Sequence, residues 1–522
     1  MDNFIQNQSE GCRNLAAQDF YTPKTEDTDR KEKENGAAFF RYYGIRMILY
    51  AAVYTFCLYR NPSGITWPVM IIATLWLFAD VMKKMQKENR KDEWFYRVSL
   101  LLIGISQCTT ANETVQTCNV MAAFLLFTVL VVRNFSEAWK DGISLTSYIG
   151  QMFQIWFRPI GLLGRPFSDP FHFVVDGKTR TGENGNTARD VMIGILISIP
   201  LLALILTLLS SADPIFGNLL NGMISGIVFP AHFGTVFNIL FMAFVIYLAG
   251  YCMICFLQGH TSEIKTEKLE KAPALIAMIF SGMLTAVYLV FSVVQMISLL
   301  AGQMALPQGY SYSEYVHEGF GQLLAVCLIN LILLTATDNF FTKNRILDGI
   351  LTVMCGCTYI MATSAIVRIF MYVAAYRLTF YRVLVIWTIL VVYLCLTLLT
   401  FHIYMPELPV FRYCVGMITV MYLLLALGHP DYWIAEYNLA GILREHQGTI
   451  TAEMIEQDGS LQASLSDFNE LSQDAVPAIM KNPQIAQYYK EQHSVNPEKY
   501  TFDSVRCLNL SELKAQQLLR NK

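Results

Sequence analysis

Charged residues are scarce in this sequence. Asp, Glu, Lys and Arg make up 15% of its 522 residues, whereas an ordinary globular chain carries about 25%. The net charge is -3, so the chain lacks the basic excess with which proteins neutralise nucleic-acid phosphates. Apolar residues take the place of the charges, since 54% of the chain is hydrophobic and the mean hydropathy is +0.39. These values exclude a nucleic-acid partner and indicate a membrane protein.

Motifs for metals, cofactors and phosphates are also lacking. The twelve cysteines include no CxxC pair, and no Cys and His stand at the spacing that zinc requires. The sequence has no HExxH motif and no phosphate-binding loop. We therefore expect no metal and no cofactor, and we expect the cysteines to be small packing residues.

The first 36 residues lack the apolar run and the small-residue cleavage site of a signal peptide. They are instead dense in charge, as in KTEDTDRKEKEN at positions 24–35. Such a segment cannot bury enough apolar surface to fold. We expect residues 1–36 to be a disordered polar tail on the cytoplasmic side.

Long apolar runs fill most of the remaining chain. The hydrocarbon core of a bilayer needs roughly 20 mostly apolar residues for each crossing helix. The runs predict an all-α fold, a polytopic transmembrane bundle of about eleven helices with a small helical appendage at the C-terminus. The predicted spans lie near residues 37–58, 63–82, 95–111, 117–134, 190–210, 234–257, 273–300, 319–338, 349–372, 382–402 and 410–428.

The loops between these spans alternate in charge. Lys and Arg gather in every second segment, namely 83–97, 133–189, 265–271 and 342–345. The segments between them contain neither residue: 108–117, 211–233 and 301–318. Basic loops are retained in the cytoplasm. The alternation therefore predicts a plasma-membrane protein with a cytoplasmic N-terminus and, for an odd number of spans, an extracytoplasmic C-terminus.

The spans fall into two groups with a different segment between them. Residues 37–134 hold the first four predicted spans and residues 190–428 hold seven more. In the intervening segment 135–189, apolar residues recur at three- and four-residue spacing: Leu145, Ile149, Met152, Trp156, Ile160 and Leu163. This pattern predicts an amphipathic helix in the cytoplasmic interface, kinked at Pro159.

Residues 429–522 are polar and acidic, and they form the predicted appendage. Leu461, Leu465, Phe468 and Leu471 lie on one helical face, and Asn509 to Glu512 resembles a capping box. Fewer than about 100 residues bury too little apolar area for an independent enzyme core. We expect this appendage to be a surface for a protein partner.

Charged residues gather at one side of the predicted bundle. With the orientation above, the extracytoplasmic ends of the spans carry Asp213, Glu314, His317, Glu318, Arg368, Arg377 and Arg382. The arginines there are exceptions to the rule that positively charged residues stay on the cytoplasmic side. Pairing with the acids would explain them, because a guanidinium accepts a carboxylate through two parallel hydrogen bonds.

This predicted polar network has two interpretations. It is either a structural set of ion pairs that clamps helices together, or a site for an anionic ligand or lipid headgroup. Asp213 also has a simpler role open to it, because Asp followed by Pro commonly ends a helix and starts a turn. Asp338 and Asn339, at the cytoplasmic end of their span, are expected to end it at the membrane interface.

The chain resembles a family of bacterial membrane proteins, the domain of unknown function 4173 family, which is related to the 4153 group. The resemblance rests on SSADPIFGN (210–218), SYSEYVHEGFGQLLAV (311–326), RIFMYVAAYRLTFYRVLVIW (368–387), EYNLAGI (436–442) and LSQDAVPAI (471–479). It covers roughly residues 190–480, and the N-terminal third is similar in hydropathy alone. The family pattern usually has an arginine at position 317 and a glycine at position 377. The resemblance implies an integral protein of bacterial envelopes without an established activity.

Three function classes are compatible with these features. The first is a non-enzymatic sensory or envelope-organising component, favoured by the lack of a catalytic motif and by the appendage. The second is a transporter, for which Pro200 inside a span is the only hint of a broken helix. The third is a membrane enzyme that acts on a lipid-linked anionic substrate, with His317 or Glu318 as base and Arg368 and Arg377 binding phosphate. Membrane lipids are expected partners in every case.

Overall fold

The computed structural model describes residues 35–86, 93–136, 144–176, 233–259, 271–300, 312–448, 450–492 and 505–520, with Trp139 and scattered positions between 198 and 218. The chain forms two compact units, one of residues 1–55 and 157–256, the other of residues 56–156 and 257–522. All regular structure in the described residues is helical, and one isolated bridge joins Ala272 to Phe341. The predicted all-α fold is confirmed.

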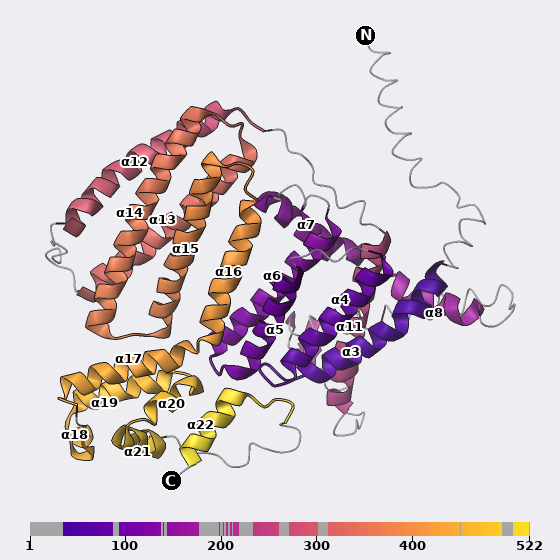
Figure 1. Cartoon of the computed structure of the whole chain (residues 1–522). Helices are drawn as coiled ribbons and strands as arrows, with labels where there is room; N and C mark the ends of the chain where they lie inside the picture. The colour runs from indigo at the N-terminus through magenta and orange to yellow at the C-terminus, as the bar shows by residue number, and fades with distance from the viewer. Residues whose placement is uncertain are drawn as a thin grey trace. The chain divides into compact units, whose positions relative to one another are not determined.

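The larger unit holds a row of long helices (Figure 1). These are α4 (Trp67–Lys84), α5 (Glu93–Thr109), α6 (Glu113–Phe135), α12 (Ala274–Leu300), α13 (Tyr312–Phe340), α14 (Arg345–Tyr376), α15 (Phe380–Tyr404) and α16 (Val410–Leu427). Helix α14 packs against α12, α13 and α15, and the row continues from α15 through α16 to α5, which lies between α4 and α6.

Polar side chains link these helices inside the row. Asn330 of α13 donates a hydrogen bond to Thr358 Oγ1 of α14 over 2.9 Å, and both residues are fully buried. Near the other end of the row, Ser106 Oγ of α5 donates to the carbonyl oxygen of Ala426 in α16. Such bonds help to hold helices together in lipid, where the hydrophobic effect does not drive helices to associate.

Seven described helices are long and apolar enough to cross a membrane. They are Glu113–Phe135, Gly234–Gly259, Ala274–Ile297, Gly321–Phe340, Arg345–Tyr376, Phe380–Tyr404 and Val410–Leu427, and each coincides with a predicted span. The predicted spans at 37–58, 63–82 and 95–111 are helical as well, but their helices are shorter or carry more charge. The predicted span 190–210 lies almost wholly outside the described residues.

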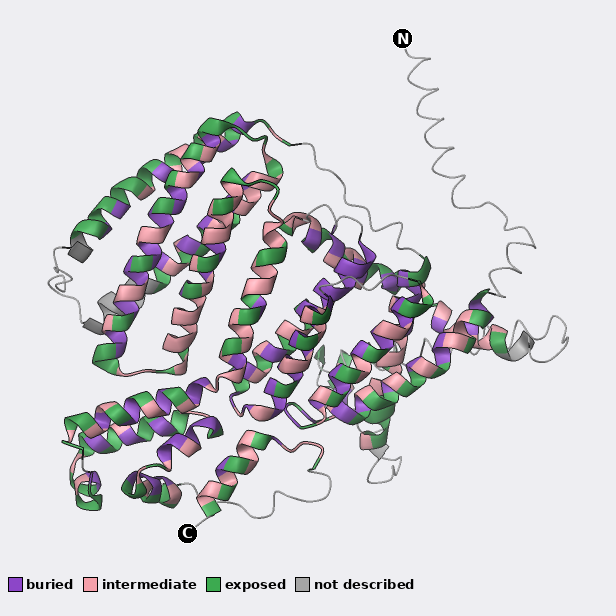
Figure 2. Ribbon diagram, in the orientation of Figure 1, coloured by how far each residue is buried: buried purple, intermediate pink, exposed green. Residues whose placement is uncertain are grey.

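The spanning helices expose apolar side chains on their outer surfaces (Figure 2). On α12, for example, Met283, Val287 and Val290 are 64% to 69% exposed. A soluble protein rarely shows so large an apolar surface, whereas lipid solvates it readily. This exposure agrees with a multi-pass membrane protein.

The smaller unit contains a π-helical turn (Phe40–Gly44), most of α3 (Ile45–Leu58), η2 (Arg158–Leu162), α8 (Arg165–Asp176) and most of α11 (Phe233–Gly259). A polar pair is buried among its apolar side chains. Tyr251 of α11 donates a hydrogen bond over 2.8 Å to Asp169 Oδ2 of α8. Asp169 is only 5% exposed, and burial raises the pKa of its carboxyl.

One helix of the larger unit lies within the predicted amphipathic segment 135–189. Helix α7 (Leu145–Phe157) buries Tyr148 and Ile155 and leaves Ile149 and Phe153 exposed on its opposite side. The α-helix ends where Pro159 was expected to kink it, and the chain continues as the 3-10 turn η2. The exposed apolar side is the one that an interfacial helix turns toward lipid.

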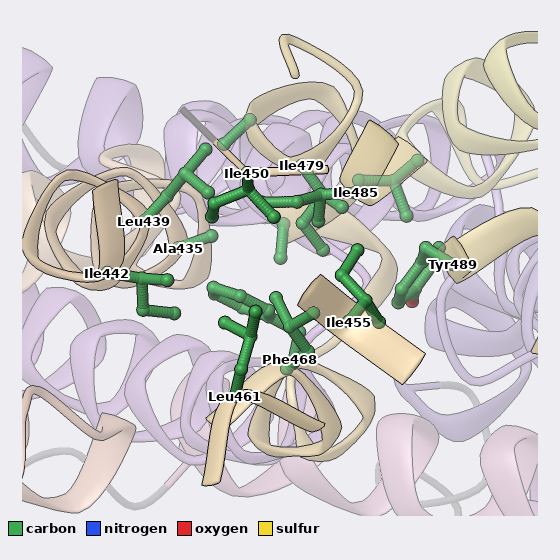
Figure 3. Close-up of a cluster of buried hydrophobic side chains, with 14 of the residues drawn as sticks. Ala435, Leu439, Ile442, Ile450, Ile455, Leu461, Phe468, Ile479, Ile485 and Tyr489 are labelled. Atoms are coloured by element: carbon green, nitrogen blue, oxygen red, sulfur yellow. The ribbon is translucent and has the colours of Figure 1, made fainter. Parts of the chain in front are cut away.

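The appendage is a compact helical domain around its own core (Figure 3). Its helices are α17 (Pro430–Glu445), α18 (Ala452–Gln457), α19 (Gly459–Ser466), η4 (Asp467–Glu470), η5 (Gln473–Ala475), α20 (Val476–Ile479), α21 (Pro483–Gln492) and α22 (Leu510–Arg520). The core includes Leu461, Leu465 and Phe468, each at most 2% exposed, as the helical stripe predicts. Asn509 caps α22 by accepting from the backbone N of Ser511.

Candidate functional site

The residues of the predicted polar network lie in different parts of the structure. Arg368 is buried within α14, and its Nη2 donates to Gln295 Oε1 of α12 over 3.3 Å. Ser364, one turn earlier, donates to the same oxygen over 2.7 Å. Arg368 is therefore part of a buried polar link between two spanning helices.

Arg377 and Arg382 meet at the corner between α14 and α15. Arg377 pairs with Glu445 at 3.0 Å, an acid of the appendage that sequence patterns did not single out. Arg382 donates to the carbonyl oxygens of Tyr376 and Arg377 and lies over the ring of Tyr372. These two arginines thus brace the corner and fasten it to the appendage.

The backbone at Arg377 is in an unfavourable conformation for a residue with a side chain. Arg377 adopts φ 65° and ψ -179°, a region that almost only glycine populates, at a cost of about 1–3 kcal/mol for other residues. The ion pair with Glu445 offsets part of that cost. Exposed pairs of this kind contribute about 0–1 kcal/mol.

Asp213 lies in the smaller unit and is exposed. Its Oδ1 accepts a hydrogen bond of 2.8 Å from the backbone N of Ile215, which is the geometry expected of a turn or helix cap. The three arginines belong to the larger unit. An ion pair between Asp213 and an arginine therefore stays a prediction.

Glu314, His317 and Glu318 lie in the first turns of α13. The structure describes only the backbone at these positions. Their proposed part in an anion site stays a prediction as well.

A buried carboxylate of the appendage makes several polar contacts with other parts of the chain. Asp474 is 3% exposed, and both of its oxygens accept hydrogen bonds from the loop between α5 and α6. Thr110 Oγ1 donates to Oδ2 over 2.6 Å, and the backbone N of Ala111 donates to Oδ1 over 2.8 Å. Ser511 of α22 also donates to Oδ1, and His429 Nδ1 lies 3.5 Å from Oδ2.

A second buried carboxylate lies at the same loop. Asp431, 1% exposed in the first turn of α17, accepts from Asn112 Nδ2 over 2.8 Å and from the backbone N of Ser472 over 3.1 Å, both at Oδ2. Its Oδ1 has no hydrogen-bond partner among the described residues. We call Asp431, Asp474 and loop residues 110–112 the acidic joint.

Further contacts surround the acidic joint. Asn509 Nδ2 donates to the carbonyl oxygen of Thr110 over 2.7 Å, and the backbone N of Ile65 donates to the carbonyl oxygen of Leu508 over 3.0 Å. On the other side, Asn438 of α17 exchanges two hydrogen bonds with the backbone of Leu378. The appendage is therefore attached to α5, α6 and the α14–α15 corner by directed polar bonds.

The surroundings of Asp474 favour its charged form. Burial alone raises the pKa of its carboxyl, but contact with His429 and hydrogen bonds from Ser511, Thr110 and the Ala111 backbone outweigh burial and lower this pKa. A carboxylate with several donors is stabilised in the ionised state. Asp474 thus acts as a permanent negative acceptor at neutral pH.

The opposite end of the row has another charged cluster. Asp338 Oδ2 lies 3.0 Å from His402 Nε2 of α15, Oδ1 lies 3.5 Å from Lys343 Nζ, and Lys271 Nζ donates to the Asp338 carbonyl oxygen. Asp338, Lys343 and His402 line a cavity of about 30 Å³. Helix α13 ends at Phe340, so Asp338 lies at a helix end as expected, and its carboxylate in addition links α13 to α15.

Sequence patterns had passed over the acidic joint. Thr110 and Asn112 stand in QCTTANET, a stretch that reads only as a polar break between spans, and Asp474 stands in LSQDAVPAI, quoted for the family resemblance. An uncharged polar loop offers donors, and an acid directly before the apolar stretch AVPAI offers an acceptor. Their pairing across more than 360 positions had no local signal.

The two buried aspartates should respond differently to neutralisation. Asp474→Asn leaves one of the loop or α22 donors without an acceptor, which costs about 1–3 kcal/mol. Asp431→Asn keeps the oxygen that accepts from Asn112 and Ser472, so we expect a clearly smaller loss. Thermal or denaturant unfolding in detergent measures both variants, with exposed Asp467→Asn as control. Equal losses for the two buried positions would contradict these roles.

The stability difference between the natural chain and Asp474→Asn should depend on pH. Because folding lowers the pKa of Asp474, its contribution is complete above the unfolded value of about 4 and is lost as pH falls through the folded value. The difference should be constant from neutral to mildly acidic pH and shrink below about pH 4. A difference that grows on acidification would oppose this interpretation.

Arg377 should tolerate glycine better than alanine. Arg377→Gly removes about 1–3 kcal/mol of backbone strain and loses an ion pair of smaller value, so it should be at least as stable as the natural chain. Arg377→Ala keeps the strain and loses the pair, so it should be less stable. Unfolding of both variants in detergent decides the order, and a glycine variant weaker than the alanine variant would refute the strain.

Comparison with known proteins gives a family and no activity. The model of the family described as Domain of unknown function (DUF4153) matches residues 97–482, more than half of the chain. The match starts within α5, so the likeness reaches further toward the N-terminus than the motifs indicate. None of the curated proteins and none of the solved structures matches the chain. The resemblance to the 4173 family rests on the sequence motifs alone, whereas the chain belongs to the DUF4153 family.

Proposed function

We propose that the protein is a non-enzymatic sensory or envelope-organising component of a bacterial plasma membrane, with the appendage as the module that meets a protein partner. The observation that carries this proposal is the acidic joint. Both oxygens of Asp474 are used by donors of the protein itself. Its charge therefore holds two parts of the chain together and is not free for proton transfer.

The exposed acidic residues of the appendage favour a protein partner with a basic surface. Besides Glu445, which pairs with Arg377, its exposed acids include Glu453, Glu456, Asp467, Glu470 and Glu491. Complementary charge speeds encounter and selects partners, and the effect weakens as salt increases.

We infer that the appendage lies on the extracytoplasmic side. Asp474 and Asp431 bond directly to residues 110–112, which lie within the segment 108–117 that contains no Lys or Arg. The appendage is thus on the same side as this loop, whatever the number of spans. Loops without basic residues are the ones that are translocated to the extracytoplasmic side.

Reporter fusions test this orientation. Fusions after residues 90, 225, 310 and 470 should report the cytoplasm at the first position and the extracytoplasmic side at the other three. A cytoplasmic signal after residue 225 or 310 would overturn the orientation as a whole. A cytoplasmic signal after residue 470 alone would overturn the placement of the appendage.

Purification from the native membrane tests the function class. A protein that co-purifies in constant ratio with the natural chain and with Asp431→Asn, and is lost from Glu453→Lys/Glu456→Lys, supports the proposal. The charge-reversed variant must first show the same unfolding curve as the natural chain, so that loss of the partner reflects the surface. Retention of the partner by that variant would refute the acidic surface.

The transporter and enzyme alternatives have one supporting observation of their own. Arg368 is a charged residue buried in a spanning helix beside Gln295 and Ser364, and buried charges of this kind often mark ligand or ion paths. A co-purified lipid-linked phosphate that Arg368→Gln no longer retains would favour the enzyme. Solute uptake by reconstituted vesicles would favour the transporter.

A further inference from the structure

Helix α17 is tied to the ends of spanning helices along its whole length. In its first turn, Asp431 Oδ2 accepts from Asn112 in the loop between α5 and α6. In its middle, Asn438 bonds both backbone groups of Leu378 at the α14–α15 corner, at 2.9 and 2.8 Å. In its last turn, Glu445 pairs with Arg377 at 3.0 Å. The helix is therefore held at one level, across the ends of the spans (Figure 1).

The short connection from α16 to α17 also places α17 at the ends of the spanning helices. Helix α16, a spanning helix, ends at Leu427, and α17 begins at Pro430. The turn between them passes through His429 in the left-handed region, with φ 47°. The 16 residues of α17 extend about 24 Å, so the helix runs along the membrane surface from the point where α16 leaves the bilayer.

The faces of α17 differ in their partners. Ala435, Leu439 and Ile442 face the core of the appendage, and Asn438 and Glu445 face the spanning helices. A further stripe is exposed and lies beside the bundle-facing one, since successive residues turn by about 100°. It consists of Trp433, 62% exposed, Tyr437, 52% exposed, and the exposed residues Ala440 and Arg444.

We propose that this stripe of Trp433, Tyr437, Ala440 and Arg444 binds the headgroup layer of the bilayer that surrounds the bundle. Trp and Tyr concentrate at this depth because their rings are apolar and their N–H and O–H groups are polar. Arg444 extends its guanidinium to lipid phosphate while its stem lies along apolar surface. The assignment holds for either orientation of the protein in the membrane.

The flank of α17 between this stripe and the core-facing residues shows the character of a water-facing surface. Glu436 pairs with Lys481 at 2.6 Å, and Lys481 also donates to Tyr432 Oη. Both partners of the pair are exposed. The aromatic residues and the ion pair thus divide the free surface of α17 into a lipid side and a water side, and the appendage rests on the bilayer along one edge.

Quenching of tryptophan emission tests the proposal on the full chain in lipid nanodiscs. The emission of Trp433 is the difference between the natural chain and Trp433→Phe. We expect this emission to be lost with lipids brominated close to the headgroup, to persist more with lipids brominated near the chain ends, and to resist aqueous iodide. The control is Gln487→Trp at an exposed position of α21, which iodide should quench and brominated lipid should not.

A second variant keeps the test independent of one side chain. Tyr437→Trp in the Trp433→Phe background should restore the emission with the same order of quenching. Iodide quenching equal to that of the Gln487→Trp control would overturn the proposal, because the stripe would then face water. Protection from both quenchers would overturn it as well, because protein would then cover the stripe.

Discussion

The position of the appendage depends on one ionised carboxylate. Asp474 accepts hydrogen bonds from Thr110 and Ala111 in the loop between α5 and α6 and from Ser511 of α22, and it lies beside His429 in the turn that starts α17. A buried charge is tolerated only when donors surround it. The need to satisfy Asp474 therefore brings together elements that are hundreds of residues apart. The second aspartate and Asn509 extend the same attachment to neighbouring backbone groups.

The membrane explains why polar contacts gather at the two ends of the row. Apolar side chains cover the outer surfaces of the spanning helices, and lipid cannot satisfy polar groups there. Charged residues are placed where helices leave the hydrocarbon, at the acidic joint on one side and around Asp338 and His402 on the other. Helix α14, whose 32 residues extend about 48 Å, reaches from the Asp338 side to the corner that holds Arg377. Within the row, neutral pairs such as Asn330 and Thr358 connect helices at lower cost than charges.

Features with a local physical cause were predictable from the sequence. Span length and hydropathy located the seven spanning helices, the stripe of Leu461, Leu465 and Phe468 located the core of the appendage, and Pro159 marked the end of α7. Tertiary pairing was not predictable in this way. Asp338 looked like a helix end because its partner His402 is more than 60 positions away, and Arg377 was assigned to acids of other loops because Glu445 lies in a separate soluble segment. The acidic joint combines two weak local signals, an uncharged polar loop and an acid before an apolar stretch. Neither signal indicates the other, because the two segments meet only when the appendage folds against the loop.

Hydrogen exchange resolved to single amides tests the central claim most directly. The backbone N of Ala111 lies in a short loop, yet it donates to the buried Oδ1 of Asp474 over 2.8 Å. In the natural chain, its exchange should therefore be as slow as that of amides inside the neighbouring helices. It should become fast in Asp474→Ala, which removes both acceptor oxygens, and stay slow in Asp431→Asn. Exchange of the Ala111 amide at the rate of an open loop in the natural chain would contradict an appendage that is held by Asp474.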